Sequence, residues 1–192
     1  MTVVRAALWA GKCSPVCRPP SVPGYVPLEV QGAWLAEELA LAMGVPPAEV
    51  QRRLARGCRA FAMWSWAGDC MASWVWVSAG REWAGPLRRE LHFQPDECHG
   101  WGAHTVPRSR GLGLLPALLH YAGRAMAGAG AQVMWNGITD ENQASQRAHA
   151  AAGMRPVLHL VAQHEPAPTR LMSWACDYAD PRWVARARLI VA

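Results

Sequence analysis

The amino-acid sequence predicts an α/β (α+β) fold in which a central sheet of about seven strands carries helices on both faces. Its segments follow the order strand, two helices, three strands, helix, strand, helix, two strands. A tryptophan-rich hairpin places large apolar residues on both of its faces, which predicts a sheet covered on both sides. A basic glycine loop between residues 105 and 119 then joins a strand to an apolar helix, an arrangement typical of anion sites.

The composition fits a single globular domain covering residues 1–192. Hydrophobic residues make up 52% of the chain and charged residues 17%, which argues against a disordered chain. The net charge of +5 suits an anionic ligand as well as an ordinary basic surface, and the scattered arginines do not favour nucleic acid as a partner. No apolar run approaches the ~20 residues of a membrane span, and the N-terminus does not resemble a signal peptide. We therefore expect a cytoplasmic protein with no membrane partner.

The six cysteines do not indicate a metal site. Only Cys13 and Cys17 lie close together in the sequence, and no second pair with zinc-ligand spacing accompanies them. We expect most of the six to be buried free thiols, and we expect no metal.

The first third of the chain is predicted to hold one strand, a long loop and two helices. The strand runs from residue 2 to about residue 10, and five prolines indicate a loop over residues 11–29. Apolar periodicity predicts a helix over residues 31–43, and a Pro-Pro pair opens a second helix over residues 46–56. The apolar face of the first helix is expected to hold Trp34, Leu35, Leu39 and either Ala42 or Met43.

The next segments, residues 58–67 and 70–78, are predicted to form a hairpin around Gly68-Asp69. A two-residue turn would set the register of the two strands. That register pairs Trp66 with Met71, Trp64 with Ser73 and Met63 with Trp74, so that Trp64 and Trp66 face one way and Trp74 and Trp76 the other. These tryptophans are interpreted as core residues or as the aromatic wall of a ligand pocket.

The second half alternates strands and helices. Residues 79–96 are a charged connection, and the tail from 181 to 192 is left unassigned. Strands are predicted at Glu97–Thr105, 131–138, 155–163 and 169–178, helices at 114–127 and 142–152, and a loop at 164–168.

The glycine loop predicts a phosphate or pyrophosphate site. Gly111 and Gly113 allow the backbone to bend sharply and a ligand to approach it closely. The helix that begins near Leu114 leaves its first N–H groups unpaired at the positive end of its dipole, and Arg108 and Arg110 add charge. The loop is neither a P-loop nor a dinucleotide fingerprint, because no Gly-Lys-Ser/Thr follows and position 116 is proline.

Two motifs in order resemble the GNAT superfamily of acyl-CoA-dependent N-acyltransferases over residues 97–163. They read Thr105-x-Pro107-x-x-Arg110-Gly111-x-Gly113-x-Leu115 and Asn142-x-x-Ser145-x-x-x-His149-x-x-x-Gly153-Met154. Leu115, His149 and Met154 depart from the family's usual Gly or Ala, Tyr and Phe. The resemblance implies a mixed, mostly antiparallel sheet that splays in the middle, with the coenzyme at the splay and the acceptor near the early helices.

The resemblance also implies a set of coenzyme-binding residues for acetyl-CoA or another acyl-CoA. The backbone around Thr105 and Val106 is expected to hold the thioester and pantetheine. The pyrophosphate is assigned to the N–H groups of Arg110, Gly111, Leu112, Gly113, Leu114 and Leu115. The pantetheine arm is assigned to Asn142, and Ser145 is a further coenzyme-binding residue.

Three residues are candidates for proton transfer. His149 occupies the family's thiolate-acid position, and an imidazole with a pKa near 6.5 can donate when it is protonated. Strand alternation places Glu97, His99, Trp101 and Thr105 on one face and His104 on the other. Because Thr105 is assigned to the thioester, His99 is the first candidate for the base and Glu97 the second. Some members of the family use no residue as a base.

The predicted function is transfer of an acyl group, first of all acetyl, to the amine of a small-molecule or amino-acid acceptor. Two alternatives stand beside it: a non-catalytic acyl-CoA-binding or sensing module, and acetylation of a macromolecule such as aminoacyl-tRNA. His149 keeps the first alternative open, and the basic tail is the only hint of the second. The acceptor, the acyl length and a homodimeric state remain open.

Overall fold

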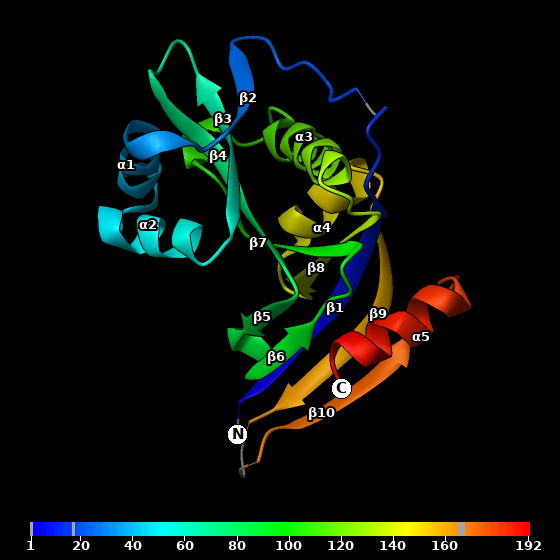
Figure 1. Cartoon of the computed structure of the whole chain (residues 1–192). Coiled ribbons are helices and arrows are strands. Elements are labelled where there is room, and N and C mark those ends of the chain that lie inside the picture. Colours follow the sequence, from blue (N-terminus) through cyan, green and yellow to red (C-terminus); the bar gives the residue numbers. More distant parts are fainter. Residues whose placement is uncertain (1, 17, 165–167) are drawn as a thin grey trace.

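A computed structural model describes residues 2–16, 18–164 and 168–192 (Figure 1). The main sheet has eight strands in the order β10-β9-β1-β8-β7-β4-β3-β2, and β5 and β6 form a small second sheet. All strand pairs are antiparallel except β7 with β8. The strands are β1 (Val3–Lys12), β2 (Tyr25–Glu29), β3 (Arg59–Ser65), β4 (Cys70–Ala79), β5 (Arg81–Ala84), β6 (Arg89–His92), β7 (Glu97–Thr105), β8 (Val133–Thr139), β9 (Arg155–Gln163) and β10 (Arg170–Ala175). The helices are α1 (Gly32–Met43), α2 (Pro47–Ala55), α3 (Leu114–Gly128), α4 (Gln143–Ala151) and α5 (Pro181–Ile190).

Helices cover both faces of the sheet, as the sequence predicts (Figure 1). One face packs against α3 and α4 through a core that includes Phe61, Met63, Leu118 and Ile138. The other face is covered in two parts, by α1 and α2 over β3 and β4 and by α5 with the β5–β6 hairpin over β1 and β9. The predicted fold class is therefore confirmed, with one more strand in the main sheet than expected.

The sheet opens between β7 and β8. Their parallel pairing extends only from Glu97 opposite Val133 to Gly100 opposite Asn136, although both strands continue beyond it. The Asn136 Nδ2 donates to the Gly100 carbonyl oxygen at 2.9 Å and closes the last paired position. A Cβ on Gly100 would lie 2.6 Å from that nitrogen, so glycine makes room for this contact. Beyond this point the two strands leave a gap in the middle of the sheet.

A β-bulge in β7 corrects the predicted alternation. His104 pairs with Trp74 and Trp101 with Trp76, so two residues of β7 lie opposite the single residue between those tryptophans. Gly102 takes a φ of 60° in the bulge, a conformation that favours glycine. The bulge turns His104 to the face of Trp101, and strand alternation then places Thr105 on the opposite, α3-facing side. The predicted shared face of Thr105 and His99 is therefore wrong.

The predicted register of the tryptophan hairpin is also wrong. Ser65 pairs with Cys70 and Trp64 with Met71, so the connection is the four residues 66–69 and not a two-residue turn. The loop is held by the Gly68 N–H, which donates to Ser65 Oγ at 3.1 Å. A β-bulge between Met63 and Trp64 shifts the register by one residue, so that Trp64, Trp74 and Trp76 share the face under α1 and α2, while Trp66 is 67% exposed in the loop. Apolar residues on the opposite face, including Phe61, Met63 and Val75, still cover the sheet on both sides.

Other differences concern edges and termini. The proline-rich segment over residues 11–29 contains β2, an edge strand in which Pro27 is tolerated. The charged connection over residues 79–96 contains the β5–β6 hairpin. The unassigned tail forms α5, whose first N–H groups are capped by Asp180 through a bond from the Arg182 N–H at 2.8 Å.

The predicted apolar face of the first helix is partly wrong. Ala36, Leu39 and Ala40 are the buried residues of α1, and Trp34 is 59% exposed. Its ring lies 5.3 Å from that of Trp64, so it covers the edge of the core and not its centre.

Cys13, Cys58, Cys70, Cys98 and Cys176 are free thiols, three of them buried. Cys17, part of the predicted loop over 11–29, and most of the predicted loop over 164–168 lie outside the described residues. No group of three or more potential metal ligands occurs within the described ranges. None of the helices in those ranges is long and apolar enough to cross a membrane.

Candidate functional site

A cavity of about 560 Å³ lies where β7 and β8 separate. Three segments that are distant in sequence form it: the end of β7, the glycine loop with the start of α3, and the exposed side of α4. The predicted coenzyme-binding residues that line it are Thr105, Arg110, Gly111, Gly113, Leu114, Leu115, Asn142 and Ser145. Val106 packs beneath the loop and Leu112 is half exposed, so the walls contain neither side chain.

The glycine loop has the geometry of an anion site. Gly111 and Gly113 take φ values of 79° and 75°, and α3 begins directly afterwards at Leu114. Within the described chain, the backbone N–H groups from Gly111 to Leu115 have no hydrogen-bond acceptor. These donors sit at the positive end of a helix of 15 residues and favour a bound anion.

Two arginines supply further positive charge. Arg110 Nε donates to the Thr105 carbonyl oxygen at 3.1 Å, which fixes its side chain across the loop. Arg147 lines the cavity from α4 and forms no ion pair with any described residue. Its charge is thus available to a ligand.

Asn142 begins α4 as its N-cap. Its Oδ1 accepts a hydrogen bond from the Ser145 N–H at 3.1 Å, which satisfies one of the free donors of the helix start. The amide nitrogen of the same side chain has no acceptor among the described residues and lies at the cavity wall. Asn142 can therefore donate to a carbonyl group of a ligand while it caps the helix.

His149 lies behind the cavity wall, one turn after Ser145. The imidazole is 1% exposed, and its Nδ1 is 2.8 Å from the Ser145 carbonyl oxygen, which must accept the proton of that nitrogen. Burial lowers the pKa of His149, and the Ser145 carbonyl only partly opposes this shift. The side chain is consequently a neutral imidazole near pH 7, and its buried Nε2 has no partner in the described chain.

Asn136 is a candidate site residue that the sequence analysis did not identify. Its Oδ1 is buried and unpaired, and the residue lies opposite Trp9, whose ring is 6.5 Å from that of His149. Two hydrogen-bond acceptors without donors, Asn136 Oδ1 and His149 Nε2, therefore lie at the splay, on the side of the sheet that α3 and α4 cover. Buried acceptors are rarely left unpaired, so a donor from a ligand or water fits this place. No motif marks Asn136, and only strand pairing shows its position.

Glu97 and His99 lie away from the cavity, on the part of β7 that is still paired with β8. The Glu97 carboxylate is held by Arg186, whose Nε donates at 2.8 Å, and by the Trp135 indole N–H at 3.2 Å. His99 is buried against Phe93 with 5.1 Å between ring centroids, and burial lowers its pKa to about 4. The structure does not bring either candidate base to the cavity.

His104 instead reaches the cavity. It stacks on Trp74 with 4.7 Å between ring centroids and keeps an exposed edge. Partial burial lowers the pKa of His104, and the nearby Arg110 charge lowers it further. The signal that could have indicated this position is Gly102, because glycine inside a strand often marks a bulge.

The aromatic residues beside His104 continue away from the cavity, under α2. Trp76 and Trp101 stack with 5.7 Å between ring centroids, and the Arg53 guanidinium lies 5.2 Å and 5.1 Å from their centroids. Trp74 and Trp76 are buried and Trp101 is half-buried, so most of this cluster is core and its edge borders the open face.

No protein-family model and no curated protein matches this chain. Solved structures do match. An acetyltransferase of the GNAT family from Novosphingobium aromaticivorans is 19% identical over 84% of this chain and 63% of its own, with a TM-score of 0.56. A tandem GNAT protein from the clavulanic acid biosynthesis pathway is 16% identical over 88% of this chain and 56% of its own, with a TM-score of 0.56. A GNAT-family acetyltransferase from Streptococcus pneumoniae is 14% identical over 79% of this chain and 98% of its own, with a TM-score of 0.52.

At these identities the likeness concerns the fold. This chain spans 63% and 56% of the lengths of the first two of these proteins. The mixed sheet, its splay and the order of its elements are those of the GNAT fold, so the fold implied by the two sequence motifs is confirmed.

Proposed function

We propose that this chain, which has the GNAT fold, transfers an acyl group from an acyl-CoA, first of all acetyl-CoA, to the amine of a small-molecule acceptor. The observation that carries the proposal is the cavity at the splay, where free N–H groups at the start of α3 lie within one space with the unpaired edge of β7 and with Asn142. A ligand with a pyrophosphate at one end and an amide-containing arm at the other matches these groups.

In this arrangement the N–H groups from Gly111 to Leu115 bind the pyrophosphate, and Arg147 adds a positive charge. Beyond Gly100, the side of β7 that faces β8 has no paired strand, so the backbone groups along that side can pair with the amides of pantetheine. Asn142 donates to the same arm. These contacts direct the thioester toward the gap in the sheet.

The reaction needs a neutral amine, an oxyanion site and a proton for the leaving thiolate. The amine nitrogen attacks the thioester carbonyl carbon, a backbone N–H at the end of β7 stabilises the oxyanion, and the carbon–sulfur bond breaks. His104 is placed to accept the proton of the amine, because its lowered pKa keeps the imidazole neutral near pH 7. By the motif, His149 is the candidate donor of the proton to the thiolate, and it must be protonated before it can donate.

The proposal is tested by incubating the chain with acetyl-CoA and a pool of primary amines and following free thiol with a colorimetric reagent. We expect thiol release that depends on the amine. Calorimetric binding of coenzyme A without release under any acceptor would favour the non-catalytic binding module. Release only with aminoacyl-tRNA would favour the macromolecular acceptor, and absence of coenzyme binding would contradict the proposal.

A substitution of His104 should separate its role from those of other surface histidines. His104→Gln is expected to lower kcat/KM about 100-fold or more, the range of a positioned base. In the wild type kcat/KM, calculated for the neutral form of the amine, should decline as the pH falls through the folded pKa of His104, which lies below 6.5. The variant should lose that acid decline. His92→Gln, an exposed histidine on β6, is the control, and an equal effect of both substitutions would contradict the assignment.

A further inference from the structure

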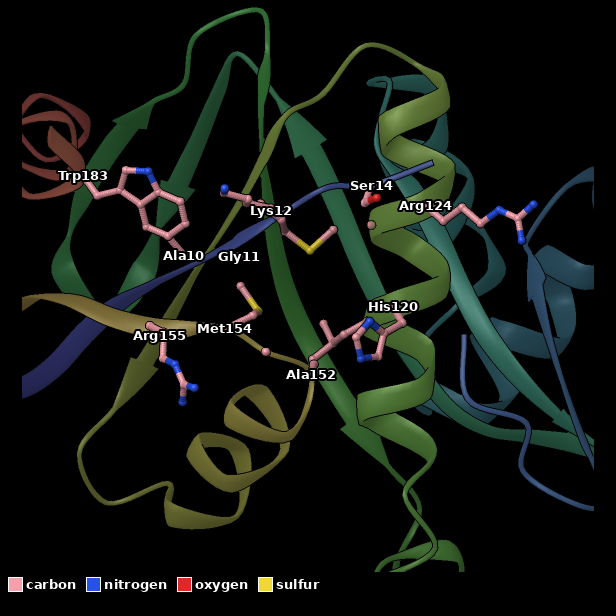
Figure 2. A pocket seen from close by; sticks show the side chains of 14 residues that line it. Ala10, Gly11, Lys12, Ser14, His120, Arg124, Ala152, Met154, Arg155 and Trp183 are labelled. Carbon is pink, nitrogen blue, oxygen red and sulfur yellow. The ribbon is translucent and has the colours of Figure 1, made fainter. Parts of the chain in front are cut away.

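A second cavity, of about 360 Å³, lies toward the opposite end of α3 (Figure 2). The end of β1, the middle of α3, the turn from α4 into β9 and Trp183 of α5 form its walls. It shares no lining residue with the cavity at the splay. Nothing in the proposed acyl transfer uses it.

The walls carry positive charge that no described residue neutralises. Lys12, Arg124 and Arg155 line the cavity, and no aspartate or glutamate does. None of the three forms an ion pair within the described ranges, whereas Arg59 and Arg186 each bind a carboxylate. Figure 2 shows Lys12 extending toward Trp183 and Arg155 on the α4 side of the cavity, whereas the Arg124 side chain points outward beyond α3. Lys12 and Arg155, two cations without ion-pair partners on the Trp183 side of the cavity, favour an anion there.

The rest of the lining is mainly apolar, with Ser14 and His120 as its polar members, and includes a flat aromatic surface. Leu119, Met134 and Met154 contribute to the walls, and Trp183 borders them with its indole partly exposed. The Trp183 ring also lies 6.1 Å from that of Trp135, which supports it from the sheet. A bare inorganic ion would leave this surface unused, whereas a planar ring could stack on the indole.

Gly123 is the second reason to regard the cavity as a ligand site. It lies inside α3, where glycine destabilises a helix relative to alanine. Nothing lies within 4 Å of the place where its Cβ would be, and its φ is not positive, so neither packing nor backbone geometry requires glycine there. Its lack of a side chain widens the cavity wall.

We propose that this cavity binds a small multivalent anion attached to a planar ring, with the anion near Lys12 and Arg155 and the ring against Trp183. The volume is at the small end of the range for ligand pockets, about 300 to 1,000 Å³, and suits a mononucleotide or an aromatic polycarboxylate. Both ligands carry a multivalent anion on a planar ring, but they come from different metabolite classes.

The test is calorimetric titration with adenosine monophosphate, benzene-1,3-dicarboxylate, adenosine and inorganic phosphate. In the first series coenzyme A is present at saturation, and in a parallel series the Gly113→Asp variant is used without it. Both conditions prevent adenosine monophosphate from binding at the splay cavity. We expect one of the two ring anions to bind in both series, and which of them binds identifies the source. Adenosine and inorganic phosphate should each bind at least about tenfold more weakly, because each lacks one half of the recognised chemistry.

Two kinds of variant locate the binding. Gly123→Leu fills the cavity and should abolish binding, while Gly123→Ala should retain the fold and raise the melting temperature. Lys12→Gln combined with Arg155→Gln should weaken binding at least about tenfold, and the exposed Arg81→Gln should not change it. If Gly123→Leu does not fold, the charge variants alone show whether the ligand binds in this cavity. Absence of binding by both ring anions, equal binding of inorganic phosphate or adenosine, or affinity unchanged in the charge variants would overturn the proposal.

Discussion

Gly113→Asp is expected to remove coenzyme A binding and leave the chain folded. Gly113 is the N-cap of α3, and nothing lies within 4 Å of the place where a Cβ would be, so the new side chain has room. Its φ of 75° is strained for most residues but is adopted by Asp and Asn more readily than by others. The carboxylate would accept hydrogen bonds from the N–H groups that the pyrophosphate needs, and its negative charge would repel the phosphates. We expect at least about a hundredfold loss of affinity, or about 2.7 kcal/mol, by calorimetry.

Gly113→Asn is the matched control, because it has the same shape and a similar tolerance of positive φ without the charge. It should retain clearly more affinity than the aspartate variant. Gly130→Asp, at another glycine with positive φ beyond the far end of α3, should bind coenzyme A like the wild type. An aspartate variant at position 113 that is folded and binds normally would show that the loop is only a turn.

His149→Phe is expected to lower turnover by about 10²–10⁴-fold if the imidazole protonates the thiolate, the range typical of a positioned acid. The KM for the coenzyme should change little, because thiolate charge develops mainly in the transition state. Since burial lowers the pKa of His149, the imidazolium is lost as the pH rises through a value below 6.5, and wild-type turnover should fall over that interval. His149→Tyr should recover much of the rate and remove this fall, because a phenol stays protonated to a pH near 10.

The competing explanation is that His149 only fills space under α4. Its Nδ1 bond to the Ser145 carbonyl and its contact with Trp9 would then account for its burial. In that case His149→Phe would change the melting temperature and leave turnover per folded molecule intact. Measuring both quantities on the Phe and Tyr variants distinguishes the two roles, and a Phe variant with full turnover would end the catalytic assignment.

Local sequence patterns predicted the helices and strands whose ends are determined by neighbouring residues. β7 and β9 have the predicted bounds, and α3 and α4 begin within a residue of theirs, because glycines and an Asn cap act on their own neighbours. The same is true of the glycine loop, whose positive φ values need only the two glycines. The motif order therefore indicated the residues of the cavity at the splay and the GNAT fold together.

The register of paired strands and the contacts between distant residues could not be predicted from local sequence patterns. The bulge at Gly102 exchanged His104 for His99 as the residue that reaches the cavity, and it exists because β4 and β7 pair with one residue out of step. In the hairpin, the β-bulge between Met63 and Trp64 placed Trp64 on the same face as Trp74, under α1 and α2. One residue of slip reverses every side chain beyond it, so alternation alone cannot decide such faces.

By itself, then, the sequence determined the bounds of β7 and β9, the positive φ values of the glycine loop and the start of α4, since each depends on backbone preferences within a few residues. It did not indicate β2, β5, β6 or α5. The tertiary structure alone decided which groups meet. It buried His149 beside Trp9, enclosed Glu97 with Arg186, and gathered Lys12, Arg155 and Trp183 around a second cavity. These contacts join residues from separate strands and helices, and their distances follow from how the layers pack, which no local preference specifies.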